Sequence, residues 1–152
     1  MALNQYLKTD QYFSDTWDNT GEQATNIIKN CNIPLDLLSR VNASVEITLV
    51  EWCNNHWLHE FLLDVAHGTD DFGYVLIDHD VLKKFVKLAD KVIEDPSLME
   101  ETFPYPSWWQ DVKGEYPTYS DYDYDVLIGT THKFKRILSE LPNVDLVYKF
   151  SV

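Results

Sequence analysis

Apolar residues alternate with polar ones in several short stretches of the chain. This spacing predicts strands, because successive side chains of a strand point to opposite faces. The pattern is present at about residues 44–49 and at 146–152. The alternative for residues 44–49 is the first turn of a longer helix. A short apolar run at 74–77 indicates a further buried strand or extended link, and residues 2–8 are also expected to form a short strand. Both ends of the sequence are therefore expected to lie in strands.

Elsewhere the apolar residues recur every three or four positions, which is the spacing of one face of a helix. This pattern predicts a short helix at about 18–31, longer helices at about 50–66 and 81–92, and a final helix over 127–141. Helices packed on a small, mostly antiparallel sheet bury such faces economically, so we expect an α+β fold with three or four helices. We expect one domain over residues 1–152, in which the first and last strands can pair.

Residues that commonly begin or end helices flank two of these segments. A glycine just after the last apolar position permits a left-handed cap, so Gly68 is expected to end the helix at 50–66. Asp78 or Asp80 is expected to cap the next helix, which stops before Pro96. Both helices therefore have predicted ends as well as predicted faces.

The composition fits a globular protein of ordinary size. The chain has 152 residues, of which 45% are hydrophobic and 24% are charged, so it can bury a core. It contains no apolar stretch long enough to cross a membrane and no pattern of a secretory signal. We interpret Cys31 and Cys53 as free, reduced thiols of a cytosolic protein.

A strong excess of acidic residues narrows the expected partners. Asp and Glu number 25 against 12 Lys and Arg, which gives a formal net charge of −13. Such a surface repels nucleic acid and anionic membranes, so we expect neither as a direct partner. It suits a basic protein partner, and it also suits solubility alone.

The stretch NHWLHEFLLDVAHGTDDFG, residues 55–73, is the strongest candidate for chemistry. His56 and His59 lie one helical turn apart, and Asp70 and Asp71 follow in the next turn. Imidazole nitrogens and carboxylate oxygens suit zinc, manganese or iron(II), and a bound metal could lower the pKa of its water for hydrolysis. The spacing lacks the HExxH arrangement, whose histidines lie four apart on one helix face.

A structural role explains the same residues, and we favour it. His59 would bridge its helix to a backbone carbonyl through one ring nitrogen. Asp70 and Asp71 would accept backbone N–H groups and fix the turn, while Gly73 would supply a positive φ. We therefore expect no cofactor, and His56, His59, Asp70 and Asp71 form the alternative metal set.

Residues 103–124 combine eight aromatic side chains with several acids, and prolines and Gly114 interrupt any regular element there. Tryptophan and tyrosine are enriched at binding hot spots, and acids around them would steer a basic partner. The residues that we expect to contact a partner are Trp108, Trp109, Asp111, Glu115, Tyr116, Tyr119, Asp121 and Asp123. The alternative is that the rings only cover the edge of the core beneath an irregular loop.

The order of motifs resembles a family of small bacteriophage and prophage proteins. The motifs are MALNQYL at the start, WDNT, EW followed by NHWLHEFLLDV, and GTDDFGY. The matching positions are Trp17, Trp52, His59, Asp70, Asp71 and Gly73. The chain departs from the family at Ala2, where the family has glycine, at Cys53 and Asn54, where it has Arg-Lys, and at Phe72, where it often has cysteine. The resemblance implies a phage origin and an α+β fold, and it brings no activity with it.

Together these features favour a small acidic phage-encoded protein that binds a host protein in the host cytoplasm. The expected effect is inhibition of host defence or redirection of host machinery, for example by occupation of a basic nucleic-acid-binding surface. One alternative is a metal-dependent hydrolase that uses His59, Asp70 and Asp71. A second alternative is a structural or assembly role in the phage particle.

Overall fold

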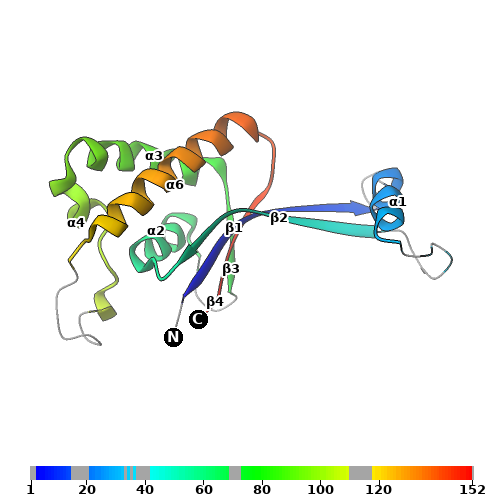
Figure 1. Cartoon of the computed structure of the whole chain (residues 1–152), viewed down its shortest axis with the longest axis horizontal. Helices are drawn as coiled ribbons and strands as arrows, with labels where there is room; N and C mark the ends of the chain where they lie inside the picture. The colour runs from blue at the N-terminus through cyan, green and yellow to red at the C-terminus, as the bar shows by residue number, and fades with distance from the viewer. Residues whose placement is uncertain are drawn as a thin grey trace. The chain divides into compact units, whose positions relative to one another are not determined.

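The computed structural model describes residues 3–14, 21–32, 34, 36, 42–68, 73–109 and 118–151 (Figure 1). The chain divides into two compact units. The first combines Met1–Lys8 with Thr48–Val152, and the second comprises Thr9–Ile47. The expectation of one domain stays a prediction.

A four-stranded antiparallel sheet has the strand order β2-β1-β4-β3. Its strands are β1 (Asn4–Ser14), β2 (Asn42–Cys53), β3 (Tyr74–Ile77) and β4 (Leu146–Ser151). β3 pairs with β4 so that Tyr74 lies opposite Lys149 and Ile77 lies opposite Leu146. β1 and β4 are neighbours in the sheet, which confirms the expected pairing of the first and last strands.

The helices of the first unit lie on one side of its strands, and together they make the expected α+β fold (Figure 1). α3 and α6 pack along each other, and α2 contacts both α3 and β3. No helix in the described part of the chain is long and apolar enough to cross a membrane. The helical segments are α2 (His56–Ala66), α3 (His79–Glu94), the short 3-10 helix η3 (Pro96–Leu98), α4 (Met99–Thr102) and α6 (Asp121–Glu140).

The hydrophobic core of this unit lies between the helices and the sheet. α3 buries the face that its spacing predicts, and Asp78 caps it by accepting a hydrogen bond from the N–H of Val81 at 2.9 Å. α6 buries Leu127 and Phe134 in the same core. The rings of Phe85 and Phe134 meet edge to face at 5.0 Å, so α3 and α6 are joined at their apolar faces.

The second unit contains α1 (Gly21–Asn30) and the parts of β1 and β2 that fall within Thr9–Ile47. Ala24 and Ile28, one helical turn apart, are the buried residues of this helix. The predicted short helix is therefore confirmed where the structure describes it. Cys31, just after the helix, and Cys53 at the end of β2 are free thiols, as expected.

The helix predicted at about 50–66 begins later than expected. β2 continues to Cys53, and α2 begins at His56. The chain turns at Asn54, whose φ of 55° lies in the left-handed region that Asn tolerates. The N–H of Asn54 donates to the carbonyl of Leu3 at 2.7 Å, and its Oδ1 accepts from the N–H of Leu3 at 2.9 Å. Pairing with β1 therefore extends the strand past the point where helical spacing begins.

Trp52 consequently lies on β2, with its indole buried in the core. Its Nε1 donates to Oγ1 of Thr130 on α6 at 2.8 Å. Its ring lies edge-on to Phe134 and Tyr148, with centroids 6.1 and 6.5 Å away. This tryptophan of the family-like motif therefore joins the sheet to α6.

The end of α2 differs from the expected glycine cap. His67, and not Gly68, adopts the left-handed conformation, with a φ of 53°. Gly68 is required for a different reason, because a Cβ there would lie 2.7 Å from Cγ2 of Val75 on β3. Gly73 has a φ of 67°, as expected, so any side chain at that position would be strained.

Candidate functional site

A buried carboxylate at the start of α6 connects the aromatic segment to the core. Asp123 is only 7% exposed. Its Oδ1 accepts hydrogen bonds from Nε1 of Trp57 at 3.0 Å and from the hydroxyl of Tyr105 at 3.2 Å. Its Oδ2 accepts from the backbone N–H and the hydroxyl of Ser120, at 2.8 and 2.7 Å. These four donors match the acceptor capacity of an ionised carboxylate.

The local sequence explains why Asp123 takes this position. Ser120 caps α6, and its Oγ accepts from the N–H of Asp123 at 3.4 Å while the carboxylate bonds back to the N–H of Ser120. This reciprocal capping box needs a hydroxyl at the cap and an acceptor side chain three positions later. Asp123, which we expect from the sequence to contact a partner, is instead held inside the protein, because capping turns its carboxylate inward.

Five rings pack together beside this carboxylate, and we call them the aromatic cluster: His56, Tyr105, Trp108, Trp109 and Tyr119. Trp109 is central, with its ring centroid 4.9 Å from His56, 5.4 Å from Tyr105 and 5.9 Å from Trp108. His56 and Trp108 meet edge to face at 5.4 Å, and Tyr105 and Tyr119 lie 5.0 Å apart. The cluster therefore joins the first turn of α2 to the segments that follow α4 and precede α6.

Trp108 is the exposed member of the aromatic cluster, with 43% of its surface accessible. Residues 107–109 form a helical turn, and the N–H of Trp109 donates to the carbonyl of Pro106 at 3.0 Å. Pro106 itself is buried, so the turn is anchored. Trp108 is thus an accessible ring on a supported backbone, the form that anchor residues take at protein interfaces.

The hydroxyl groups of the two tyrosines are bonded inside the protein. Tyr105 donates to Asp123, and Tyr119 donates to the carbonyl of Phe103. Burial raises the pKa of both phenols well above the usual range, and the negative charge of Asp123 adds to the shift for Tyr105. Both hydroxyls therefore remain donors that hold the aromatic cluster in place.

The predicted partner-binding residues divide into groups. Trp108, Trp109 and Tyr119 share the aromatic cluster, and Asp121 is exposed in the first turn of α6. The predicted contact residues that lie outside the described residues are Asp111, Glu115 and Tyr116.

His59 is a buried core residue with a defined partner. Its Nδ1 lies 2.8 Å from the hydroxyl of Tyr148 on β4, and its ring packs edge-on against Phe150 at 4.7 Å. The same hydroxyl accepts from Nε2 of Gln5 at 2.8 Å, and the Gln5 amide bonds to the backbone of Asn55. The structure places the side-chain hydroxyl of Tyr148 beside one ring nitrogen of His59, and the bond to a backbone carbonyl that we expect from the sequence stays a prediction.

The two histidines of the predicted metal set contact different parts of the protein. His56 packs in the aromatic cluster, whereas His59 packs against β4. Asp70 and Asp71 lie outside the described residues, as does Trp17 of the family-like motif. Among the residues that the structure describes, no group of three or more His, Cys, Asp or Glu side chains could hold a metal ion.

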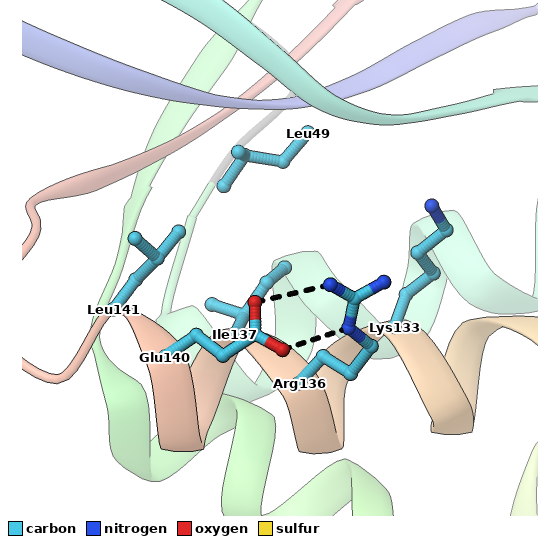
Figure 2. A pocket seen from close by; sticks show the side chains of 6 residues that line it. All are labelled: Leu49, Lys133, Arg136, Ile137, Glu140 and Leu141. Atoms are coloured by element: carbon cyan, nitrogen blue, oxygen red, sulfur yellow. Dashed lines mark hydrogen bonds and ion pairs between the residues drawn. The ribbon is translucent and has the colours of Figure 1, made fainter.

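A small pocket of about 140 Å³ lies along the second half of α6 (Figure 2). Figure 2 shows that Arg136 and Glu140 point toward each other, and their two hydrogen bonds measure 2.9 and 3.1 Å. The Arg136 guanidinium lowers the pKa of the Glu140 carboxyl. These two groups therefore form an ion pair at the edge of the pocket. The pocket is lined by Leu49, Lys133, Arg136, Ile137, Glu140 and Leu141.

The role of Gln5 is not predicted from the sequence, although the sequence contains a signal for it. Leu3, just before β1, and Leu7 on β1 are buried, and Gln5 between them is fully buried too. A polar residue on an apolar strand face needs a partner inside the protein. Its partners, the Tyr148 hydroxyl and the Asn55 backbone, come from distant parts of the chain.

Comparisons with known proteins identify no relative of this chain. No protein-family model matches it, and searches of curated proteins and of solved structures likewise found no match.

Proposed function

We propose that this protein acts by binding a basic protein partner and not by catalysis. The observation that supports this most is Trp108, an exposed indole whose turn is held by the aromatic cluster and, through Tyr105, by Asp123. Exposed tryptophans on ordered supports contribute strongly to interfaces, since they bury a large area at low entropic cost.

The charge of the protein supports a basic partner. The chain carries a formal net charge of −13, and Asp121 is exposed in the first turn of α6. An acidic surface accelerates encounter with a positively charged surface and suppresses encounter with nucleic acid. A partner that itself binds nucleic acid would present such a surface, so occupation of that surface is the proposed mode of inhibition.

The setting of this activity follows from the resemblance to small bacteriophage and prophage proteins. We propose that the protein is phage-encoded and acts in the cytoplasm of the bacterial host. Anti-defence activity and takeover of host machinery are the two effects that fit a small binding protein of this origin.

Capture from bacterial lysate tests the proposal. The immobilised protein is compared with Trp108→Ala and with Tyr74→Ala, which removes a similarly exposed ring from β3. We expect one or more basic proteins to be captured by the protein and by Tyr74→Ala, and to be lost with Trp108→Ala. Three identical lists of captured proteins would contradict the proposal.

A further inference from the structure

A cleft of about 400 Å³ lies next to the aromatic cluster. One wall is α2, which contributes Trp57, Phe61 and Val65 along one face. A second wall is α3, with Leu88, and the third is the segment 102–107. Phe61, Val65 and Leu88 are each only partly buried, so the cleft offers apolar surface to a ligand. Its volume lies in the range of roughly 300–1,000 Å³ that is typical of ligand sites.

Charged groups sit on two walls of this cleft. Glu60 and Asp64 lie one turn apart on α2, and Lys84 lies on α3. In the described part of the chain, none of these three groups takes part in an ion pair. Two carboxylates against one ammonium leave the cleft net negative, in a protein that is itself strongly acidic. The complementary ligand therefore combines apolar and basic groups.

We propose that this cleft binds a short basic segment of a protein partner, with an apolar side chain against Phe61 and Leu88 and a Lys or Arg beside Glu60 and Asp64. This inference rests on the proposed function, since it assigns a second contact to the same kind of partner. Tyr105 lines the cleft and also packs on Trp109 of the aromatic cluster, so the two surfaces are continuous. A partner that covers Trp108 can therefore place an adjoining segment in the cleft.

Titration with a synthetic peptide, followed by amide chemical shifts in NMR, tests this site. The probe alternates Leu and Arg over five residues, and a matched peptide carries Glu in place of Arg. We expect the Leu-Arg peptide to shift amides of residues 57–65, 84–88 and 102–107, and the Leu-Glu peptide to leave them unchanged. Shifts outside these segments only, no shifts, or equal shifts with both peptides would overturn the proposal.

Two double variants, each lacking two carboxylates, distinguish the contribution of the cleft to peptide binding from that of the general charge of the protein. Glu60→Gln with Asp64→Asn should weaken binding of the Leu-Arg peptide about 5- to 30-fold, because two partly exposed ion pairs are lost. Glu94→Gln with Asp145→Asn removes the same charge from exposed positions outside the cleft, and it should leave the affinity within about twofold. Equal weakening by both pairs would overturn the proposal. Thermal melts and spectral dispersion establish that each variant is folded.

The two experiments distinguish failure of the cleft proposal from failure of the proposed function. If the peptide does not bind while Trp108→Ala still abolishes capture from lysate, the cleft proposal fails and the proposed function stands. If the peptide binds in the cleft while capture does not depend on Trp108, the proposed use of that tryptophan fails and the cleft stands.

Discussion

The indole nitrogen of Trp57 on α2 donates a hydrogen bond of 3.0 Å to Oδ1 of Asp123 on α6. The same oxygen accepts from the hydroxyl of Tyr105, which packs on Trp109. One buried carboxylate thus links two core helices to the aromatic cluster. Trp108, the exposed member of that cluster, is therefore connected to a buried carboxylate through Trp109 and Tyr105.

Replacement of the Asp123 carboxylate tests how much it contributes to the stability of the fold. Asp123→Asn places an NH₂ group where donors now converge, so at least one buried hydrogen bond becomes a donor–donor contact. We expect the free energy of unfolding in urea to fall by about 1–3 kcal/mol. Asp125→Asn, an exposed change on the same helix, should stay within about 0.5 kcal/mol. An Asp123→Asn protein as stable as Asp125→Asn would refute this role.

We expect the partly buried tyrosines Tyr105 and Tyr119 to cause a loss of stability at high pH. Burial raises the pKa of Tyr105 and Tyr119 in the folded protein, whereas both phenols titrate near pH ~10 in the unfolded chain. Above that pH the unfolded state binds fewer protons than the folded state, so the free energy of unfolding falls as pH rises. The decline should be shallower for the Tyr105→Phe/Tyr119→Phe double variant, measured by urea unfolding across the range. Equal slopes would show that these phenols do not carry the effect.

The structural interpretation of His59 predicts that a chelator has no effect on stability. Its imidazole is buried in the core, and its Nδ1 lies 2.8 Å from the Tyr148 hydroxyl. We expect the melting temperature to be the same with and without EDTA. A melting temperature that falls with EDTA and recovers with added zinc would instead favour the metal set of His56, His59, Asp70 and Asp71.

A side chain at position 68 should clash with Val75, and a smaller residue at position 75 should relieve this clash. In Gly68→Ala the new Cβ would lie 2.7 Å from Cγ2 of Val75, and a β-branched side chain cannot easily rotate away. We expect a loss of about 1–3 kcal/mol in the free energy of unfolding, as for other overpacked sites. Gly68→Ala combined with Val75→Ala should lose less than the sum of the two single changes. Strict additivity would argue against the contact.

Much of the fold follows from local patterns in the sequence. The face of α3, its cap at Asp78 and the presence of strand β4 are predicted, because spacing and capping depend only on neighbours along the chain. The one-sided burial that alternation predicts for β4 is not observed, because Val147 is buried together with Leu146 and Tyr148. The true end of β2 is not predicted from the sequence, because it depends on the hydrogen bonds between Asn54 and Leu3, which lie far apart in the chain. Helical spacing begins before the strand ends, so periodicity alone misplaces the boundary.

The candidate site is predicted only in part, for a related reason. The richness of residues 103–124 in aromatics and acids indicates an interface, but composition does not tell which side chains turn inward. Asp123 shows this most clearly, since its capping bond to Ser120 and its bond to Trp57 together bury it. The Ser-x-x-Asp spacing is readable in the sequence, whereas the approach of Trp57 is a tertiary contact.

The most direct test of the account is the affinity of the purified captured partner for the protein and for Trp108→Ala, measured by titration calorimetry. If Trp108 is the main anchor, its truncation should weaken binding at least about tenfold, because such anchors contribute more than ~1.4 kcal/mol. The Tyr74→Ala protein should bind as the parent protein does. Unchanged affinity of Trp108→Ala, with its fold intact, would contradict the claim that this surface makes the interaction.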